Sequence, residues 1–481
     1  MKLRELLNGL TILSSSADLD ADIREVRYDS RAVETGDLFV AITGAETDGH
    51  KYIPMAREKG AACVVCQTVP EDGTPYVQVA DSRRALAVIS ANRFDHPADE
   101  LTMIGVTGTS GKTTSTYLIK SILEQKAGAR VGLIGTIQNM IGDRVLHTER
   151  TTPESYELQK LLREMADAGC SHVVMEASSH ALYLDRVYGI RYAVGVYTNL
   201  SRDHLDFHHT MEEYCDAKAI LFDNCDVGVY NADDPWHERL LQNARCPRRF
   251  SYAVHTQADL TAKNVQLHPG SVDFDAEADT EWAQVHVDTP ALFTVYNALD
   301  AMACCWNLGV PLAECADALA KSHGVKGRME IIPTPGKSYT ILNDYSHKPD
   351  ALENVLQSVK GFAKGRTVVL FGCGGDRDKT KRPVMGAIAA QLADFVIVTS
   401  DNPRTEKPEA IIADILEGMK DTATPYVTIP DRVEAIHYAM DHAQPGDVII
   451  LAGKGHEDYQ EINHKHYPMD ERVIVAAHLN K

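Results

Sequence analysis

Short apolar runs alternate with longer segments of mixed apolar and polar residues through the middle of this chain. The apolar runs have the length of buried strands and lie at 101–106, 130–135, 172–176, 193–198 and 227–231. The segments between them that we expect to be helices include 113–125, 155–168 and 211–221. Strands that alternate with helices at this spacing predict a largely parallel sheet covered on both faces.

The same alternation returns in the last third of the chain. Strands are expected at 367–371, 395–399, 426–429 and 448–452, and helices at 384–392, 408–419 and 432–442. Ahead of the middle region, short strands and helices are mixed, and a polar segment containing proline follows at 95–100. The pattern predicts an α/β fold with three domains: a small N-terminal α/β domain at 1–97, a central parallel-sheet domain at 98–328, and a Rossmann-like doubly wound C-terminal domain at 329–481.

Composition narrows the classes of partner. The 481 residues carry a formal net charge of −20, which argues against nucleic acid because a phosphate backbone needs clustered Lys and Arg. The apolar runs are too short for a membrane span, and the N-terminus lacks the features of a secretory signal. We therefore expect a soluble cytoplasmic protein with small-molecule partners. Among ten scattered cysteines, Cys63 and Cys66 are expected to be reduced core thiols rather than metal ligands or half of a disulfide pair.

A glycine loop carries the first chemical signal. It runs Thr107-Gly108-Thr109-Ser110-Gly111-Lys112-Thr113-Thr114, after an expected strand and before an expected helix. Backbone N–H groups converge on phosphate oxygens in that setting, Lys112 can reach the outer phosphates, and the Thr113 hydroxyl can coordinate Mg²⁺. Val106 stands where the usual pattern has its first glycine. The alternative is a tight turn with a chance Lys-Thr, but the placement of Gly111 favours a P-loop ATPase-like domain.

Polar clusters follow several expected strands. Glu176 could hold a metal near the phosphates, and the loop at 198–208 concentrates Asn, Asp and His, including His204. Alone, Glu176 would be an ordinary strand-end acid and Lys218 an ordinary helix lysine. Further clusters lie in the last third. Three of their members could hold an amino acid, since Arg pairs with a carboxylate and Glu with an ammonium: Arg377, Arg404 and Glu457.

The order and spacing of these motifs closely resemble the Mur ligases over essentially the whole chain. The resemblance implies an ATP-dependent, Mg²⁺-dependent acid–amino-acid ligase of peptidoglycan synthesis, usually monomeric. Its reaction would pass through an acyl phosphate on the D-glutamate γ-carboxylate of UDP-N-acetylmuramoyl-L-alanyl-D-glutamate, with meso-2,6-diaminopimelate as the incoming amine. The first domain would then bind the UDP group and the third the amino acid.

The resemblance also assigns roles to individual residues. Catalysis and metal binding would fall to Lys112, Thr113, Glu176, His204 and Lys218, the last as an N-carboxylated lysine. ATP would contact the loop 108–114 and Asn297, Arg328, Asp344 and His347. The UDP group would contact Tyr28, Ser30, Ala45, Glu46 and Thr47, and the dipeptide Thr151, Thr152, Ser178, Leu184 and Arg186. The amine would contact Arg377, Asp401, Asn402, Pro403, Arg404, Gly453 and Glu457.

Arg404 bears on the choice of amine. Diaminopimelate carries a second carboxylate where lysine has only hydrogen, so Arg404 would pair with the former and gain nothing from the latter. Three positions depart from the family pattern and concern secondary contacts: Arg150, Leu184 and Lys348. The alternatives are a lysine-adding ligase, a folylpolyglutamate synthase of the wider superfamily, and an inactive nucleotide-gated binding protein. The presence of Lys112, Glu176, His204 and Lys218 disfavours the last.

Overall fold

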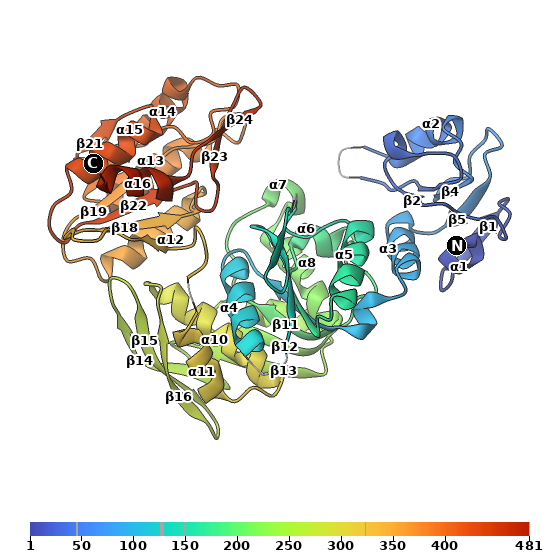
Figure 1. Ribbon diagram of the computed structural model, residues 1–481, viewed down its shortest axis with the longest axis horizontal. Coiled ribbons are helices and arrows are strands. Elements are labelled where there is room, and N and C mark those ends of the chain that lie inside the picture. The colour runs from blue at the N-terminus through green and yellow to red at the C-terminus, as the bar shows by residue number, and fades with distance from the viewer. Residues whose placement is uncertain (45–46, 126–128, 149, 323, 481) are drawn as a thin grey trace. The chain divides into compact units, whose positions relative to one another are not determined.

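The computed structural model describes residues 1–481 apart from 45–46, 126–128, 149, 323 and 481 (Figure 1). The chain divides into two compact units, Met1–Ser251 and Tyr252–Lys481. The first contains the N-terminal domain and the central sheet with the glycine loop. The second contains an antiparallel meander and the C-terminal domain.

The N-terminal domain is a five-stranded sheet with helices on its faces. Its strands, in spatial order, are β1 (Ile12–Ser15), β5 (Tyr76–Val79), β4 (Cys63–Cys66), β3 (Leu38–Val40) and β2 (Val26–Arg27), all parallel except β1. Its α-helices are α1 (Leu3–Leu6), α2 (Ile53–Glu58) and α3 (Ser82–Arg93). The Asp81 carboxylate caps α3 by accepting hydrogen bonds from the N–H groups of Arg83 and Arg84.

The central sheet places the glycine loop at its middle strand. Strand β6 (Thr102–Thr107) lies between β10 (His172–Glu176) and β11 (Tyr192–Tyr197), and all three are parallel. The sheet continues through β12 (Cys225–Asn231) on one side and β7 (Val131–Ile134), β8 (Asn139–Ile141) and β9 (Arg144–Leu146) on the other. The parallel core confirms the predicted fold class. The antiparallel pairs β7–β8 and β8–β9 are an addition that the apolar pattern did not indicate.

Helices link these strands. Three of them lie where the sequence predicts helices: α4 (Lys112–Gln125), α5 (Ser155–Asp167) and α8 (Met211–Asp223). The shorter helices α6 (Ser179–Tyr183), α7 (Leu205–His208) and α9 (His237–Asn243) were not predicted. In α5, Leu158, Leu161, Leu162 and Met165 recur at helical spacing and are buried in one core cluster. Strand β13 (Arg248–Ala253) lies at the boundary of the two units.

The second unit begins with an antiparallel meander. Strands β14 (Leu260–Leu267), β15 (Val272–Ala278) and β16 (Trp282–Val287) pair in sequence order, and α10 (Leu292–Asn307) and α11 (Leu312–Ala320) follow. The sequence pattern predicts no strand in this stretch. Its alternating residues bury one face only: in β16 Ala283, Val285 and Val287 are buried while Trp282 and Gln284 are exposed.

The C-terminal domain is the predicted doubly wound sheet. Its spatial order is β17 (Glu330–Ile332), β18 (Thr340–Asp344), β22 (Val448–Ala452), β19 (Thr367–Phe371), β20 (Phe395–Val398) and β21 (Tyr426–Thr428), parallel except β17. Helices α12 (Pro349–Lys360), α13 (Lys381–Leu392) and α14 (Pro408–Glu417) pack into one apolar cluster, and α15 (Arg432–Asp441) and α16 (Glu471–Leu479) into another. A hairpin of β23 (Tyr459–Ile462) and β24 (Lys465–Pro468) precedes α16.

All ten cysteines are buried free thiols. Cys63 and Cys66 lie in β4, as predicted for core thiols, and burial raises the pKa of Cys63 to about 12 and of Cys66 to about 11. No helix in the described part of the chain is both long and apolar enough to cross a membrane.

Candidate functional site

The glycine loop has the backbone geometry of a phosphate cradle. Gly108 has φ +148°, and a Cβ at that position would lie 1.8 Å from the Thr198 hydroxyl oxygen, so no side chain fits. Val106 is buried inside β6 and paired with strands on both sides, which explains why no glycine stands there. The loop therefore begins after the strand and runs directly into α4.

The end of β11 holds the loop in place. The Thr198 hydroxyl donates to the Ser110 carbonyl at 2.6 Å, and the Asn199 amide both accepts from Ser110 N–H at 3.0 Å and donates to Ser110 O at 3.1 Å. Thr109 N–H donates to the Asn199 carbonyl at 2.9 Å. Thr198 and Asn199 belong to the polar loop that the sequence pattern marks after this strand, but neither was assigned a role of its own.

Two lysines converge on one carbonyl of the loop. Lys112 Nζ donates to Gly108 O at 2.8 Å and to Thr109 O at 2.9 Å, and Lys218 Nζ donates to the same Gly108 O at 2.8 Å. Lys218 is buried on α8 with its ammonium 4.3 Å from the centre of the Tyr214 ring. The structure thus brings together two predicted residues that are far apart in sequence and concentrates positive charge where phosphate oxygens would bind.

Glu176 lies at the centre of a buried hydrogen-bond network. Its carboxylate accepts from the Thr113 hydroxyl at 2.9 Å, from Thr136 N–H at 2.8 Å and from the Thr136 hydroxyl at 3.0 Å. The Thr136 and Thr151 hydroxyls are also hydrogen-bonded at 3.0 Å. A residue expected to contact the dipeptide is therefore linked through Thr136, which was not predicted, to the phosphate loop.

The donor set around Glu176 fits Mg²⁺. A carboxylate and a threonine hydroxyl are hard oxygen ligands, and Mg²⁺ is usually bound by one or two protein oxygens together with waters and substrate phosphates. In the described part of the chain, no group of three or more His, Cys, Asp or Glu side chains could hold a metal ion by itself. This arrangement suits a cation that arrives with a nucleotide rather than a structural metal.

His204 sits in a cluster of rings beyond β11. It has φ +53°, and its backbone N–H donates to the Asp203 carboxylate at 2.9 Å. Its ring lies 4.8 Å from that of His180 and 6.2 Å from that of Tyr214. Burial lowers the pKa of His180, and it lowers the pKa of His208 to about 4. His208 is therefore neutral at physiological pH.

The other residues that were expected to contact the dipeptide lie beside Glu176, and most of them form a second hydrogen-bond network. The Thr152 hydroxyl donates to Glu176 O at 2.7 Å and accepts from Ser178 N–H at 3.1 Å, and Ser178 caps α6. Arg186 donates to Thr152 O at 3.3 Å. Leu184, which was predicted to line this site, is half-buried and offers its carbonyl to Arg83 at 3.4 Å.

Glu154 is a buried carboxylate that no motif in the sequence marks. It lies 3.2 Å from Arg186 and 3.7 Å from both Arg83 and Arg150. With three arginines around one carboxylate, this corner has an excess of positive charge that suits an anionic substrate group.

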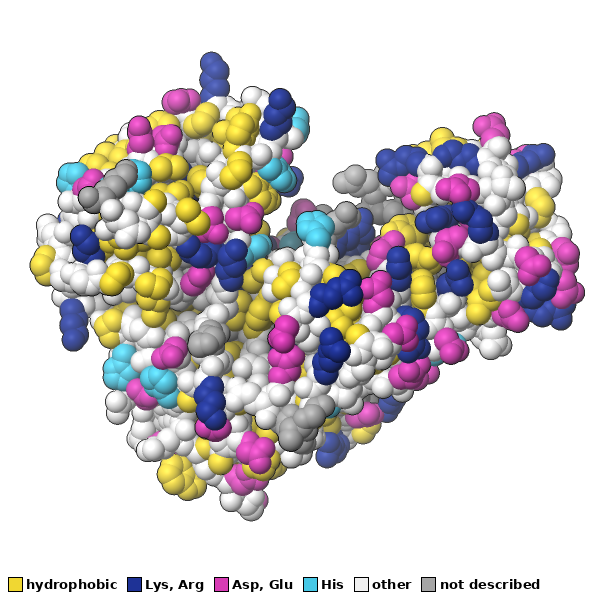
Figure 2. All heavy atoms as spheres, in the orientation of Figure 1, with side chains coloured by type: hydrophobic (Ala, Val, Ile, Leu, Met, Phe, Trp, Pro, Cys, Tyr) yellow, Lys and Arg dark blue, Asp and Glu magenta, His cyan; other side chains and the backbone are white. Residues whose placement is uncertain are grey.

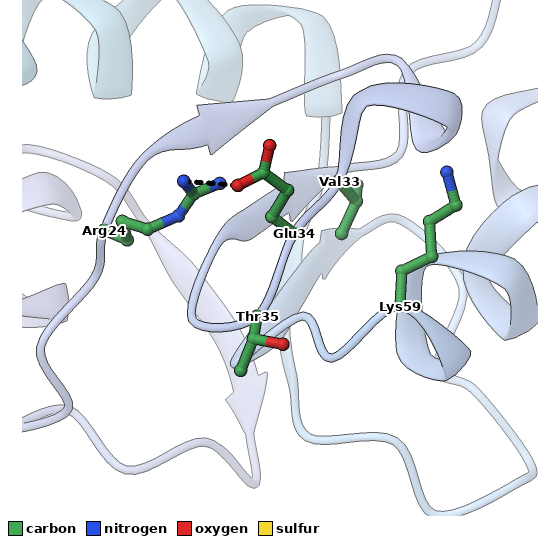
Figure 3. Close-up of a pocket in the computed structure, with 5 residues that line it drawn as sticks. All are labelled: Arg24, Val33, Glu34, Thr35 and Lys59. Atoms are coloured by element: carbon green, nitrogen blue, oxygen red, sulfur yellow. Dashed lines mark ion pairs between the residues drawn. The ribbon is translucent and has the colours of Figure 1, made fainter.

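The residues expected to contact the UDP group are spread over the N-terminal domain. Tyr28 donates its hydroxyl to Glu157 at 2.9 Å, Ser30 is buried, and the Thr47 hydroxyl lies 3.4 Å from that of Tyr52. Ala45 and Glu46 fall outside the described residues. A separate hollow of about 480 Å³ in this domain is lined by Arg24, Val33, Glu34, Thr35 and Lys59, none of which was predicted to bind anything (Figure 3).

In the second unit, three of the four residues expected near the nucleotide, Arg328, Asp344 and His347, lie around Tyr345. The Arg328 guanidinium is 5.0 Å from the Tyr345 ring, and His347 is hydrogen-bonded through Nδ1 to Tyr345 O at 2.9 Å. Burial lowers the pKa of His347 to about 4 and raises the pKa of Asp344, whose carboxylate accepts from Met329 N–H at 2.8 Å. Asn297 is buried on α10.

The residues that were predicted to bind the incoming amino acid lie at the carboxyl ends of β19, β20 and β22. The buried Lys454 ammonium donates to the Asn402 amide oxygen at 2.8 Å and to the Glu457 carboxylate at 2.7 Å. Gly453 has φ +114°, and a Cβ there would lie 2.6 Å from the Asp401 carboxylate. The loop that ends in Pro403 and Arg404 packs against Gly375, whereas Arg377 is exposed.

The visible surface of the N-terminal domain carries a mixture of positive and negative side chains. On the face shown in Figure 2, Lys and Arg side chains lie among Asp and Glu side chains over the N-terminal domain rather than in one basic patch. Among the positive groups described above, Lys218 and Lys454 are buried, and Lys112 and Arg186 are half-buried.

The fold and the glycine loop define a multidomain α/β protein of the P-loop type. Three family models match in order: the Mur ligase family catalytic domain at 22–94, the Mur ligase middle domain at 106–305, and the Mur ligase glutamate ligase domain at 327–455. The chain belongs to the Mur ligase family.

Individual relatives cover nearly the whole chain. It is 46% identical over 460 residues to UDP-N-acetylmuramoyl-L-alanyl-D-glutamate–2,6-diaminopimelate ligase of Clostridium botulinum, covering 94% of each chain, and 46% identical over 482 residues to that of Clostridium tetani, covering 99% of this chain and 98% of the relative. A solved structure of a ligase with the same name has a TM-score of 0.74 at 33% identity, with 100% of this chain and 99% of that chain covered.

Proposed function

We propose that this protein is an ATP-dependent ligase that adds meso-2,6-diaminopimelate to the D-glutamate γ-carboxylate of UDP-N-acetylmuramoyl-L-alanyl-D-glutamate, in peptidoglycan biosynthesis. The observation that carries the proposal is the hydrogen-bond network Thr151–Thr136–Glu176–Thr113. It links Thr151, a residue expected to contact the dipeptide, to the glycine loop. The names of the relatives that match over nearly the full length support the same reaction.

Activation of the carboxylate is assigned to the first unit. The γ-carboxylate oxygen attacks the γ-phosphorus of ATP, the bond to ADP breaks, and an acyl phosphate forms. Lys112 and the backbone N–H groups of residues 108–114 bind and orient the phosphates, while Arg186 and Thr152 hold the dipeptide. Thr113, Glu176 and His204 would hold Mg²⁺, which when bound neutralises phosphate charge. Asn297, Arg328, Asp344 and His347 are assigned to the rest of the nucleotide.

The second half of the reaction is amide formation. The neutral amine of the incoming amino acid attacks the acyl carbon, a tetrahedral intermediate collapses, and phosphate leaves while the amine loses its proton. Arg404 binds the distal carboxylate of diaminopimelate. Hydrogen bonds among Asn402, Lys454 and Glu457 hold together the loops after β20 and β22. L-Lysine lacks the carboxylate that Arg404 would bind, so it is the weaker candidate.

Lys218 is assigned a second role as an N-carboxylated lysine. Its neutral amine would add CO₂ to give a carbamate and release a proton, which converts a buried cation into a metal-binding anion. Its buried position against Tyr214 shields such a group from bulk water. If this is correct, activity lost in Lys218→Ala is partly restored by short carboxylic acids, and absence of any restoration would contradict the carbamate.

A side-by-side ligation assay tests the proposed function. The purified protein is given ATP, Mg²⁺ and the UDP-linked dipeptide, with meso-diaminopimelate or L-lysine as amine, and both phosphate release and the tripeptide product are measured. We expect phosphate release that requires both dipeptide and amine, with diaminopimelate strongly preferred. Equal or better use of lysine, or ATP hydrolysis independent of the amine, would contradict the proposal.

A further inference from the structure

Arg404 is held in an unusual backbone conformation by the β23–β24 hairpin. It has φ +52°, a left-handed conformation that a residue with a branched or long side chain adopts only when its surroundings support it. Its N–H donates to Glu461 O at 3.1 Å, and its carbonyl accepts from Asn463 N–H at 2.9 Å. The hairpin therefore fixes the direction in which the Arg404 side chain leaves the backbone.

The Arg404 side chain has two further partners. Its Nε lies 2.8 Å from the Glu461 carboxylate, and its Nη1 donates to Gly375 O at 2.9 Å. Both side chains are less than one-fifth exposed, at 18% for Arg404 and 19% for Glu461. A guanidinium is rigid and planar, so the ion pair at Nε and the hydrogen bond from Nη1 together fix the orientation of the Nη2 group as well.

Side chains other than that of Glu461 hold the loops around Arg404 in shape. Arg382 is fully buried and ties the Gly374 carbonyl to Glu406 and Asp414, with contacts of 2.8 to 3.3 Å. On the other side, the buried Arg432 donates to Ala452 O at 2.9 Å and pairs with Glu471 at 2.7 Å. The Glu461 carboxylate forms an ion pair with Arg404 and with neither of these buried arginines.

We propose that Glu461 is a positioning residue that aims the Arg404 guanidinium at the distal carboxylate of the amine substrate. The inference rests on the proposed function and deepens it, because it adds a second residue to the selection of diaminopimelate. Because the Glu461 carboxylate lies beside Nε, the substrate carboxylate is directed to the remaining Nη hydrogens, where a bidentate pair can form. Glu461 thus turns a flexible cation into a carboxylate receptor of fixed geometry.

Electrostatics alone would give Glu461 the opposite effect. Its negative charge sits beside the place that a substrate carboxylate would take, so as a mere competing charge it would weaken carboxylate binding, and its removal would lower the Michaelis constant. As a positioning residue, its removal raises that constant because the guanidinium must be ordered when substrate binds. The two roles therefore predict changes of opposite sign.

The test compares Glu461→Met with Glu461→Gln. The two side chains have similar length, but only glutamine keeps an oxygen that can accept from Arg404 Nε. For meso-diaminopimelate we expect Glu461→Met to raise KM about 10-fold with kcat within about 2-fold, and Glu461→Gln to stay within about 3-fold of the parent KM. Kinetics with L-lysine should not change in either variant. The control is Glu417→Met, which removes an exposed carboxylate from the same domain.

A double-substitution cycle with Arg404→Ala separates positioning from general damage. In that background Glu461→Met should add less than about a 2-fold change, since the two residues act as one unit. Additive losses, equal losses with both amines, or a fall in KM would overturn the inference. If the parent protein does not ligate diaminopimelate, the proposed function and this inference both fail; if it does and Glu461→Met matches it, only the inference fails.

Discussion

The glycine loop and the loops after β19, β20 and β22 both lie at the carboxyl ends of parallel strands. The interactions that hold the two sets of loops in place are different. The phosphate loop is shaped by backbone groups, two glycines and hydroxyls, with Gly108, Thr198 and Asn199 in close contact. The loops after β19, β20 and β22 are held instead by charged side chains that are themselves buried, Arg382, Arg432 and Lys454.

This difference follows from what each region has to bind. A phosphate is recognised by many N–H groups at once, so the chain must come close and side chains must be absent. An amino acid with several charged groups needs matched side chains at fixed places, and these need partners of their own to remain charged away from water. The first region is therefore sensitive to added volume and the second to lost charge.

The largest expected effect concerns stability in the second region. Arg432→Met should lower the free energy of unfolding by about 3–5 kcal/mol, because it leaves the Glu471 carboxylate buried without its partner. Urea unfolding followed by circular dichroism measures it. Lys420→Met, at an exposed ion pair in the same domain, is the control. Arg432→Met combined with Glu471→Leu should recover part of the loss. A loss below about 1 kcal/mol in the single variant would mean that buried charge does not hold these loops.

The next effect is on catalysis in the first region. Lys112→Ala should lower kcat/KM for ligation by about 10²–10³-fold while the far-ultraviolet spectrum stays unchanged, because the lysine acts on phosphate charge and not on the core. Phosphate release measures the change. Lys160→Ala, on the exposed side of α5, should have no effect. Substantial turnover remaining in Lys112→Ala would contradict the phosphate-loop assignment.

Arg404→Ala should have a smaller and substrate-dependent effect. We expect KM for diaminopimelate to rise about 10–100-fold, the cost of one or two hydrogen bonds to a charged group. Use of L-lysine should be unchanged or improved, and the ratio of the two KM values is the quantity to report. An unchanged ratio would place amine selection elsewhere in the protein.

The smallest effect comes from an exposed ion pair on the meander, which contrasts with the buried Arg432–Glu471 pair. His286 contacts Asp273 at 2.7 Å and Asp288 at 2.9 Å, and these hydrogen bonds, the one to Asp273 first, raise the pKa of His286. A raised pKa means that the stabilisation is present below the unfolded-state value of about 6.5 and is lost as pH rises through the folded-state value.

His286→Asn should therefore destabilise the protein near about pH 5.5 by less than about 1 kcal/mol and make no difference near about pH 9. The pKa of Asp273 is lowered by the same contact, so its share is lost only as pH falls below the ordinary aspartate range. Melting temperatures of parent and variant across this range provide the measurement. A difference that grows with pH would reverse the assigned sign.

Much of this fold could be predicted from the sequence, because the length of an apolar run and its distance to the next run are local properties of the chain. The apolar runs at 101–106 and 448–452 are buried on both faces in parallel sheets, so they are continuous and easy to recognise. The meander strands β15 and β16 bury alternate residues with polar or exposed residues between them, so they contain no continuous apolar run that would mark them as strands. The short β23–β24 hairpin has no fully buried residue and gives no apolar signal at all.

The residues of the candidate site likewise fall into those that a local sequence feature marks and those that no local feature marks. Lys112, Thr113 and Glu176 could be predicted because a motif or a strand end marks them. Thr136 and Glu154 could not, since their importance arises from partners 40 residues away in one case and from three arginines in the other. The role of each expected residue in binding stays a prediction that the variants above address.

The buried free cysteines have a practical consequence for following motions of this protein. A thiol reacts only as an exposed thiolate, and burial raises the pKa of Cys63, Cys215 and Cys373 to about 12. These three lie in the N-terminal, central and C-terminal domains respectively. The rate at which a thiol reagent modifies each one thus measures how often that domain opens, so mass spectrometry of the labelled peptides can report local opening of all three domains in one sample without any engineered probe.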